Sequence, residues 1–218
     1  MGEIDLLRSL PKASRNIEKR KGAKDAEVVR RAKLFGFDYW DGPREFGYGG
    51  YRYDGRWRPV AQDIIAHYGL QTGMRCLDIG CGKGFLLHDL REACPGLEVF
   101  GLDVSEYALA NTISDIGNVC VLGSADELPY ESDFFDLVLS INTLHNLPRP
   151  RLVEALREIT RVSRGDAFVQ VDSYFTAEQK EIFESWVLTA EFHDYPDEWV
   201  RLFDEAGYRG DYFWTIIS

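Results

Sequence analysis

The sequence predicts an α/β fold in which a mostly parallel sheet of six or seven strands carries helices on both faces. Short apolar segments alternate with longer segments of helical periodicity along most of the chain. Such alternation is typical of sheets built from strand–helix–strand units. One apolar segment ends in an acidic residue and runs directly into three alternating glycines, and the next apolar segment also ends in an acidic residue, Asp103.

The N-terminal part of the chain is the least regular. Residues 1–35 are polar and charged, with a helical tendency and few core positions, and we expect an amphipathic or partly mobile arm. Residues 35–57 combine nine aromatic side chains with six glycines. Glycines favour loops and aromatics favour burial, so this segment is expected to form a cap that orders over a ligand, or a loop packed on the sheet edge. We therefore divide the chain into an arm and cap at 1–56 and a larger domain at 57–218.

The regular elements follow in a simple order. A helix runs from Trp57 to Tyr68 and ends at Gly69. The predicted strands lie near residues 74–79, 97–102, 118–122, 135–141, 166–172 and 211–217. The predicted helices lie near residues 84–93, 105–116, 149–162, 176–189 and 197–206. About ten residues follow the last helix, which is room for one strand, so the sheet has six strands unless residues 186–194 supply another.

Composition and charge narrow the class of protein. The chain has 218 residues, of which 45% are hydrophobic and 28% charged, enough for a sizeable core. The net charge of −11 repels phosphate backbones, so we expect no nucleic-acid partner. Basic clusters at 19–21 and 30–33 are interpreted as solvated helix faces. With neither a signal peptide nor an apolar run near 18 residues, no membrane contact and a cytoplasmic location are expected.

The segment at residues 76–84, C-L-D-I-G-C-G-K-G, is the most informative. Its three glycines leave a turn without Cβ atoms, so a ligand can approach the backbone, and the amides that begin the next helix point at that ligand. A dinucleotide-binding loop has its third glycine three residues after the second, where this chain has Phe85. A nicotinamide oxidoreductase is therefore disfavoured.

The G-x-G-x-G spacing, with Asp78 two residues before the first glycine, resembles motif I of the class I S-adenosylmethionine (SAM) methyltransferases. Further segments are similar to that family in the right order, at residues 98–103, 123–130, 134–140 and 163–171. The resemblance covers about residues 57–172. It implies a Rossmann-like class I methyltransferase sandwich and an enzyme that uses SAM and releases S-adenosylhomocysteine (SAH).

The resemblance also implies a set of cofactor contacts. Asp78 would reach the amino group of the methionine moiety, and Asp103 would accept the two ribose hydroxyls, because Ser105 is the better helix cap. Val104 would lie against the adenine. The candidate cofactor-binding residues are Asp78, Gly80, Cys81, Gly82, Gly84, Asp103, Val104, Ser124, Ala125, Asp126, Ser140, Tyr51 and Arg56.

The adenine loop departs from the family's pattern. Where the family has an acidic residue in its adenine loop, this chain has Ser124, a weaker partner for the adenine amine, and Asp126 can take over that role. The Ala125 amide fits a ring nitrogen in either case.

From the cap, Tyr51 would face the sulfonium, and Arg52 or Arg56 would bind the methionine carboxylate or an anionic acceptor.

The methyl-transfer site is expected just past the fourth strand, at residues 140–146. His145 is the candidate general base, with a packing histidine as the alternative, and Asn142 is expected to bind the acceptor or close the loop. We found no metal-ligand spacing among the Cys, His, Asp and Glu residues and therefore predict no metal.

The predicted function is methyl transfer to a small-molecule acceptor, such as a sugar or a secondary metabolite. The alternatives are a protein or nucleic-acid methyltransferase and a non-catalytic SAM-binding regulatory module. The sequence gives no prediction of the oligomeric state.

Overall fold

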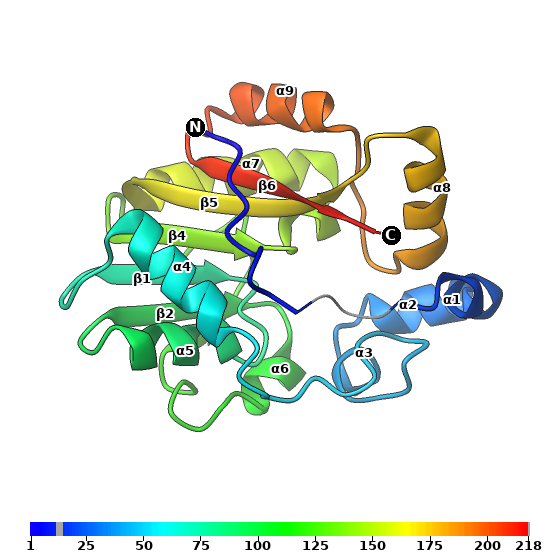
Figure 1. Ribbon diagram of the computed structural model, residues 1–218, viewed down its shortest axis with the longest axis horizontal. Helices are drawn as coiled ribbons and strands as arrows, with labels where there is room; N and C mark the ends of the chain where they lie inside the picture. Colours follow the sequence, from blue (N-terminus) through cyan, green and yellow to red (C-terminus); the bar gives the residue numbers. More distant parts are fainter. Residues whose placement is uncertain (12–14, 218) are drawn as a thin grey trace.

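A six-stranded sheet forms the centre of the molecule, and all of its neighbouring strands run parallel (Figure 1). The computed structural model describes residues 1–11 and 15–217. The strand order is β3-β2-β1-β4-β5-β6. The strands are β1 (Arg75–Ile79), β2 (Glu98–Asp103), β3 (Cys120–Leu122), β4 (Phe135–Ile141), β5 (Ser163–Ser173) and β6 (Asp211–Ile216). The order reverses between β1 and β4, as in Rossmann-like folds, and ligands bind at the carboxyl ends of the strands beside such a reversal.

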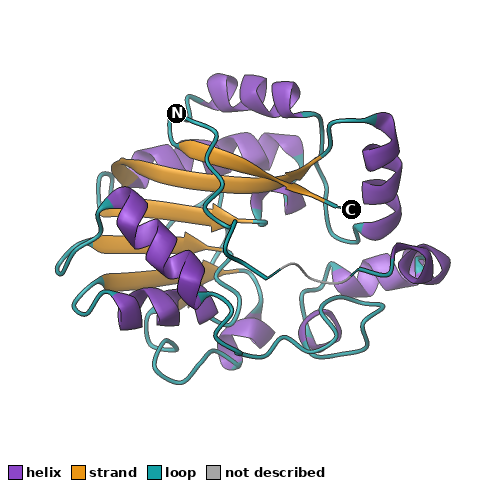
Figure 2. Ribbon diagram, in the orientation of Figure 1, coloured by secondary structure: helices purple, strands orange, loops and turns teal. Residues whose placement is uncertain are grey.

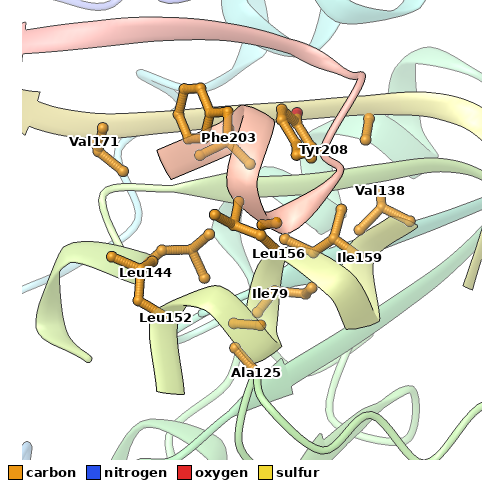
Figure 3. Close-up of a cluster of buried hydrophobic side chains, with 14 of the residues drawn as sticks. Ile79, Ala125, Val138, Leu144, Leu152, Leu156, Ile159, Val171, Phe203 and Tyr208 are labelled. Carbon is orange, nitrogen blue, oxygen red and sulfur yellow. The ribbon is translucent and has the colours of Figure 1, made fainter. Parts of the chain in front are cut away.

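Helices cover both faces of the sheet. On one face lie α4 (Arg58–Tyr68), α5 (Phe85–Ala93) and α6 (Glu106–Ala110), and on the other lie α7 (Arg149–Val162) and α9 (Pro196–Ala206). Figure 3 shows the core of the second face, where Leu156 and Ile159 of α7 pack with Phe203 of α9 against the sheet. Each buried side chain of this kind contributes roughly 1.5–3 kcal/mol. The two cores hold the strand ends, and with them the site, in a fixed arrangement.

The sequence left open whether residues 186–194 supply a further strand, and the structure shows that they do not. Residues 187–195 contain no strand, and α9 returns the chain so that β6 pairs in parallel with β5, from Phe168 opposite Asp211 to Ser173 opposite Ile216. The outer edge of β6 is covered by the N-terminus, since Ile4 N donates to Tyr212 O at 2.9 Å. Pairing of this kind protects an edge strand from other chains.

Two predicted helices are shorter than expected. The helix predicted over 105–116 ends at Ala110, because the chain then turns so that Ile113 N donates to Lys83 O at 3.0 Å and Ile116 packs under Gly84. The helix predicted over 176–189 is α8 (Ala177–Trp186), and the extended Val187 ends it.

The described part of residues 1–35 contains few core positions, as expected. Leu6 and Leu7 are buried in the core beside α4, and Val28 and Ala32 are buried in a smaller cluster. Residues 12–14 of the predicted arm and residue 218 lie outside the described residues. The division between 1–56 and 57–218 remains a proposal.

The cap lies beyond the carboxyl ends of the strands (Figure 2). It contains α3 (Phe37–Trp40) and the loop that leads to α4, and the arm helices α1 (Ile17–Ala23) and α2 (Ala26–Ala32) lie beside it. Helix α1 packs against α8 from the C-terminal part of the chain through Ile17, Ile182 and Trp186. Segments far apart in the sequence therefore meet over the strand ends. In the described part of the chain, no helix combines the length and the apolar character needed to cross a membrane.

Candidate functional site

The glycine loop between β1 and α5 adopts a backbone that only glycine accommodates. Gly80 has φ 80° and Gly84 has φ 75°, both in the left-handed region. A Cβ on Gly80 would lie 2.0 Å from Thr143 Oγ1, and one on Gly84 would lie 2.7 Å from Ile116 Cγ2. The loop is therefore packed on both sides as well as turned sharply.

Asp103 ends β2 and connects the glycine loop to the next helix. Its Oδ2 accepts from Gly82 N at 2.7 Å, and its Oδ1 accepts from Ser105 N at 2.8 Å. Ser105 caps α6 by accepting from Ala108 N, which confirms the prediction for that residue. Each oxygen of Asp103 therefore has one protein donor and keeps further lone-pair capacity for a ligand hydroxyl.

A first cavity, of about 130 Å³, opens beside Asp103 at the carboxyl ends of the strands. The predicted cofactor residues that line it are Gly80, Asp103, Val104, Ser124 and Ala125. The predicted catalytic residue Asn142 also lines it, and the cap contributes Phe35, Tyr39, Trp40 and Tyr48. The structure thus brings together the loop, strand-end and adenine-loop residues, while the roles assigned to them remain predictions.

Asp78 provides the test of whether a cationic cofactor fits this site. Its side chain is 5% exposed, and no hydrogen bond reaches its carboxylate from any residue that the structure describes. Burial, with the nearby negative charge of Asp103 as a second cause, raises its pKa to about 7. A buried carboxylate without a partner favours a positively charged ligand. The ammonium and sulfonium groups of SAM supply such charge, so the residues fit this cofactor.

Eight of the predicted cofactor residues do not line the first cavity: Asp78, Cys81, Gly82, Gly84, Asp126, Ser140, Tyr51 and Arg56. Ser140 is fully buried on β4, and its Oγ has no partner among the described residues. Cys81 belongs to the glycine loop, and its side chain is buried near Cys120. Asp126 is bound by Arg151, whose Nε lies 2.6 Å from its Oδ2, and hydrogen bonding to that guanidinium lowers the pKa of Asp126 to about 2. Because Arg151 Nη2 also donates to Ser124 Oγ at 2.9 Å, the adenine loop is held together by this arginine.

Lys83 connects the cap to the glycine loop by hydrogen bonds, and sequence reasoning did not single it out. Its buried Nζ donates to Asp41 Oδ2 at 2.6 Å and to Tyr51 O at 2.9 Å. The same carboxylate oxygen accepts from Tyr107 OH at 2.8 Å. The Tyr51 ring stacks on Phe85, with ring centroids 4.9 Å apart, and lies outside the first cavity. The sequence signal that could have identified Lys83 is its position between Gly82 and Gly84 of the loop.

A second cavity, of about 430 Å³, adjoins the first. Tyr39, Tyr48 and Asn142 line both cavities, so these three residues stand at the junction. Asn142 has φ 53°, and its Oδ1 accepts from Thr215 Oγ1 at 2.8 Å. The predicted cofactor residues Tyr51 and Arg56 line this second cavity, and Arg56 forms an ion pair with Asp54 at 2.5 Å.

His145 and Asp172 form a buried pair at the wall of the second cavity. His145 lies on the short helix η1 (Leu144–Asn146), and its Nδ1 accepts from Asp172 N at 3.2 Å. The neutral ring therefore carries its proton on Nε2, which lies 3.4 Å from Asp172 Oδ2. Burial raises the pKa of Asp172, and His145 when protonated, Arg15, and His193 when protonated oppose that rise.

Asp172 was missed in the sequence, although it ends the strand predicted over 166–172. The carboxyl end of a parallel strand is where site residues gather, and that position was the signal available. Over residues 1–11 and 15–217, no group of three or more His, Cys, Asp and Glu side chains is placed to hold a metal ion.

Comparisons with known proteins agree with this geometry. Residues 77–170 match a family model described as a methyltransferase domain. Mouse mitochondrial arginine-hydroxylase NDUFAF5 is 33% identical over 146 residues, which cover 65% of this chain and 39% of that protein. An Arabidopsis thaliana tRNA (carboxymethyluridine(34)-5-O)-methyltransferase is 34% identical over 149 residues, which cover 66% of this chain and 34% of that protein.

A demethylmenaquinone methyltransferase of Geobacillus kaustophilus is 34% identical over 116 residues, which cover 50% of this chain and 47% of that enzyme. The chain therefore spans less than half the length of each of these relatives.

Solved structures show the same fold. The YcgJ protein of Bacillus subtilis superposes with a TM-score of 0.55 at 19% identity, over 67% of this chain and 66% of that one. A Haemonchus contortus phosphoethanolamine N-methyltransferase, in complex with phosphomonomethylethanolamine and SAH, gives a TM-score of 0.54 at 19% identity, over 86% of this chain and 44% of that one. Residues 77–170 therefore form the core of a class I SAM-dependent methyltransferase domain, the family whose cofactor is SAM.

Proposed function

We propose that this protein transfers the methyl group of SAM to a small-molecule acceptor bound in the second cavity. The observation that carries this proposal is the meeting of the two cavities at Tyr39, Tyr48 and Asn142. Displacement at a methyl carbon needs donor and acceptor held in line, and alignment supplies much of the catalysis. When bound, SAM supplies a methyl carbon on a sulfonium, whose carbon–sulfur bond breaks with its electron pair on sulfur to leave SAH.

We assign to Asp172 the role of general base, which accepts a proton from the methyl acceptor. A hydroxyl loses its proton as its oxygen bonds to the methyl carbon, whereas a protonated amine must lose a proton before its nitrogen can attack, and a carboxylate with a raised pKa suits either task. His145 acts through Asp172, because its Nδ1 is already occupied by the Asp172 amide and its Nε2 faces the Asp172 carboxylate. In this proposal His145 positions Asp172, and Asn142 borders the path of the methyl group.

The shape and charge of the protein favour a small acceptor over a macromolecule. The second cavity lies between the cap, the strand ends and α8, with Arg20 and Trp186 among its walls. The net charge of −11 disfavours a polyanion. Among the relatives, the demethylmenaquinone methyltransferase is named for a small acceptor, whereas the Arabidopsis relative is named for tRNA. Protein and nucleic-acid acceptors and a non-catalytic SAM-binding module are the alternatives.

Transfer of a labelled methyl group separates these possibilities. The protein is incubated with methyl-labelled SAM and, separately, with small-molecule, total RNA and protein fractions of the source cells. Asp103→Ala, which removes the ribose contact, serves as the control. We expect Asp103-dependent label in the small-molecule fraction. Label in RNA or protein, or no label in any fraction while SAH binds tightly, contradicts the proposal.

A further inference from the structure

The second cavity contains arginines that have no acidic partner within the described residues. Fourteen of the 18 arginines lie within 4.0 Å of an Asp or Glu oxygen. The exceptions in residues 1–11 and 15–217 are Arg15, Arg20, Arg44 and Arg52, and all of them line the second cavity. In a chain with 36 acidic and 25 basic residues, an arginine on the surface readily finds a carboxylate. The clustering of these four arginines in one cavity therefore distinguishes that cavity from the rest of the described surface.

Two of these guanidinium groups are held in place by neutral groups. Arg20, 7% exposed, donates to Glu45 O at 3.0 Å and to Gly47 O at 3.1 Å. Arg44 donates to the same Gly47 carbonyl. Both lie over the Trp186 ring, at 4.7 and 5.2 Å from its centroid. Carbonyls and an aromatic face orient the two cations without neutralising them.

Placing these cations side by side is unfavourable without an anion. Burial, and then the neighbouring charge of Arg44, lowers the pKa of Arg20 to about 10. Burial is also the largest cause of the lowered pKa of Arg44. An anion bound between the two guanidinium groups removes the repulsion and replaces the lost hydration with charge-assisted hydrogen bonds.

We propose that the methyl acceptor carries an anionic group, a phosphate or a carboxylate, which Arg20, Arg44 and Arg52 bind. This inference rests on the proposed function and adds the chemical class of the substrate. Asp172, an acidic side chain in the same cavity, repels that group. The acceptor therefore lies with its anionic end at the cap arginines and its methylated atom at Asp172. Planar guanidinium donors bind phosphate and carboxylate in two-pronged fashion.

The test uses the full chain saturated with SAH and follows its melting temperature against added inorganic phosphate or acetate, at constant ionic strength. Arg52→Gln is the main variant, because no hydrogen bond or ion pair of Arg52 within the described residues is lost with the substitution. Arg44→Gln is the second variant. Arg157→Gln, which removes an exposed arginine paired with Glu154 on α7, is the matched control.

We expect a saturable rise in melting temperature for the wild type and the Arg157→Gln control. The anion concentration at half saturation should rise about tenfold in Arg52→Gln, as for a lost hydrogen bond to a charged group. Saturation by phosphate alone or by acetate alone identifies which anion the site selects. A response equal in all proteins, or none that saturates, overturns the inference.

The SAH affinity of each variant, measured by calorimetry, separates this inference from the proposed function. If the wild type does not bind SAH, the proposed function fails. If SAH binds but the anion concentration at half saturation is the same in wild type, Arg52→Gln and Arg44→Gln, only the present inference fails. A loss of SAH affinity in Arg52→Gln with an unchanged anion response assigns Arg52 to the carboxylate of the cofactor, which also overturns the inference.

Discussion

The Lys83 ammonium lies 2.6 Å from Asp41 Oδ2 and ties the aromatic cap to the glycine loop. Burial alone would raise the pKa of Asp41, but hydrogen bonds from Lys83, Tyr107 and the Tyr51 amide outweigh it and lower that pKa. Removing one partner of a fully buried pair typically costs about 3–5 kcal/mol, and because the Asp41 side chain is 22% exposed we expect a smaller cost here. This contact holds the cap over the cofactor loop together with the hydrogen bond from Trp40 Nε1 to Ser105 Oγ at 2.9 Å and the stacking of Tyr51 on Phe85.

The cap is predicted to behave as a lid that opens for cofactor exchange. Without SAH, amides of residues 41–51 should exchange with solvent faster than those of β4, and SAH should slow them. Lys83→Met should speed this exchange further, because the tie to Asp41 is lost. Hydrogen exchange followed by mass spectrometry measures both effects.

The matched control for the lid is Lys180→Met, which removes an exposed contact to Glu184 at 3.9 Å. This variant should leave exchange in the cap unchanged. Slow exchange of residues 41–51 with or without SAH, in the wild type and in Lys83→Met, contradicts the lid and identifies the cap as a fixed plug.

Asp78 predicts a particular dependence of stability on pH. Its pKa is about 3.8 in the unfolded chain and about 7 in the folded one, so between these values the folded state holds the extra proton. The free energy of unfolding should therefore fall as pH rises from about 4 to about 7, and Asp78 should add no further change above that. Asp78→Asn should reduce this fall by on the order of 2 kcal/mol between pH 5 and pH 8.

Urea unfolding of the SAH-free protein at the two pH values measures this difference, since contributions from other groups cancel between wild type and variant. Calorimetry should also show weaker SAH binding by Asp78→Asn, because the cationic amino group loses its charged partner. An identical pH dependence in wild type and Asp78→Asn contradicts the assignment.

The Asp172–His145 pair gives a prediction about the rate of methyl transfer. Asp172→Asn should lower kcat by roughly 10²–10⁴-fold, the range typical of a lost general base. His145→Ala should lower it less, because the carboxylate remains and only its orientation is lost. The wild-type rate should rise with pH through the raised pKa of Asp172, since the ionised carboxylate is the active form.

Single-turnover assays of both variants, with SAH affinity as the control for the cofactor site, test the pair. Affinity for SAH should stay within about twofold of wild type. A larger loss in His145→Ala than in Asp172→Asn reverses the two roles and contradicts the account.

Elements with strong local signals were predictable from the sequence. The helix predicted over 149–162 matches α7 residue for residue, because apolar periodicity and the neighbouring prolines act locally. The parallel sheet followed from the alternation of elements, and the candidate cofactor residues that line the first cavity followed from the resemblance to class I methyltransferases. The end of α6 at Ala110 was not predictable, because it is set by the distant contacts of Ile113 with Lys83 and of Ile116 with Gly84.

The second cavity could not be predicted from local sequence patterns. Arg20 was interpreted as part of a solvated helix face, and the structure corrects this, because Trp186 of α8 covers it and two cap carbonyls accept its hydrogen bonds. The burial of Arg20 depends on α1 meeting α8, two segments more than 150 residues apart in the sequence. No local signal in either segment indicates that contact.

Calorimetric titration of SAH into wild type and Asp103→Ala tests the central claim most directly. The account predicts that the wild type binds SAH and does not bind NAD, and that Asp103→Ala loses about 1.5–3 kcal/mol of binding, a roughly 10- to 150-fold weaker affinity. Asp103→Asn should lose less, because one acceptor oxygen remains. Unchanged SAH affinity in Asp103→Ala, or binding of NAD in place of SAH, would contradict the account.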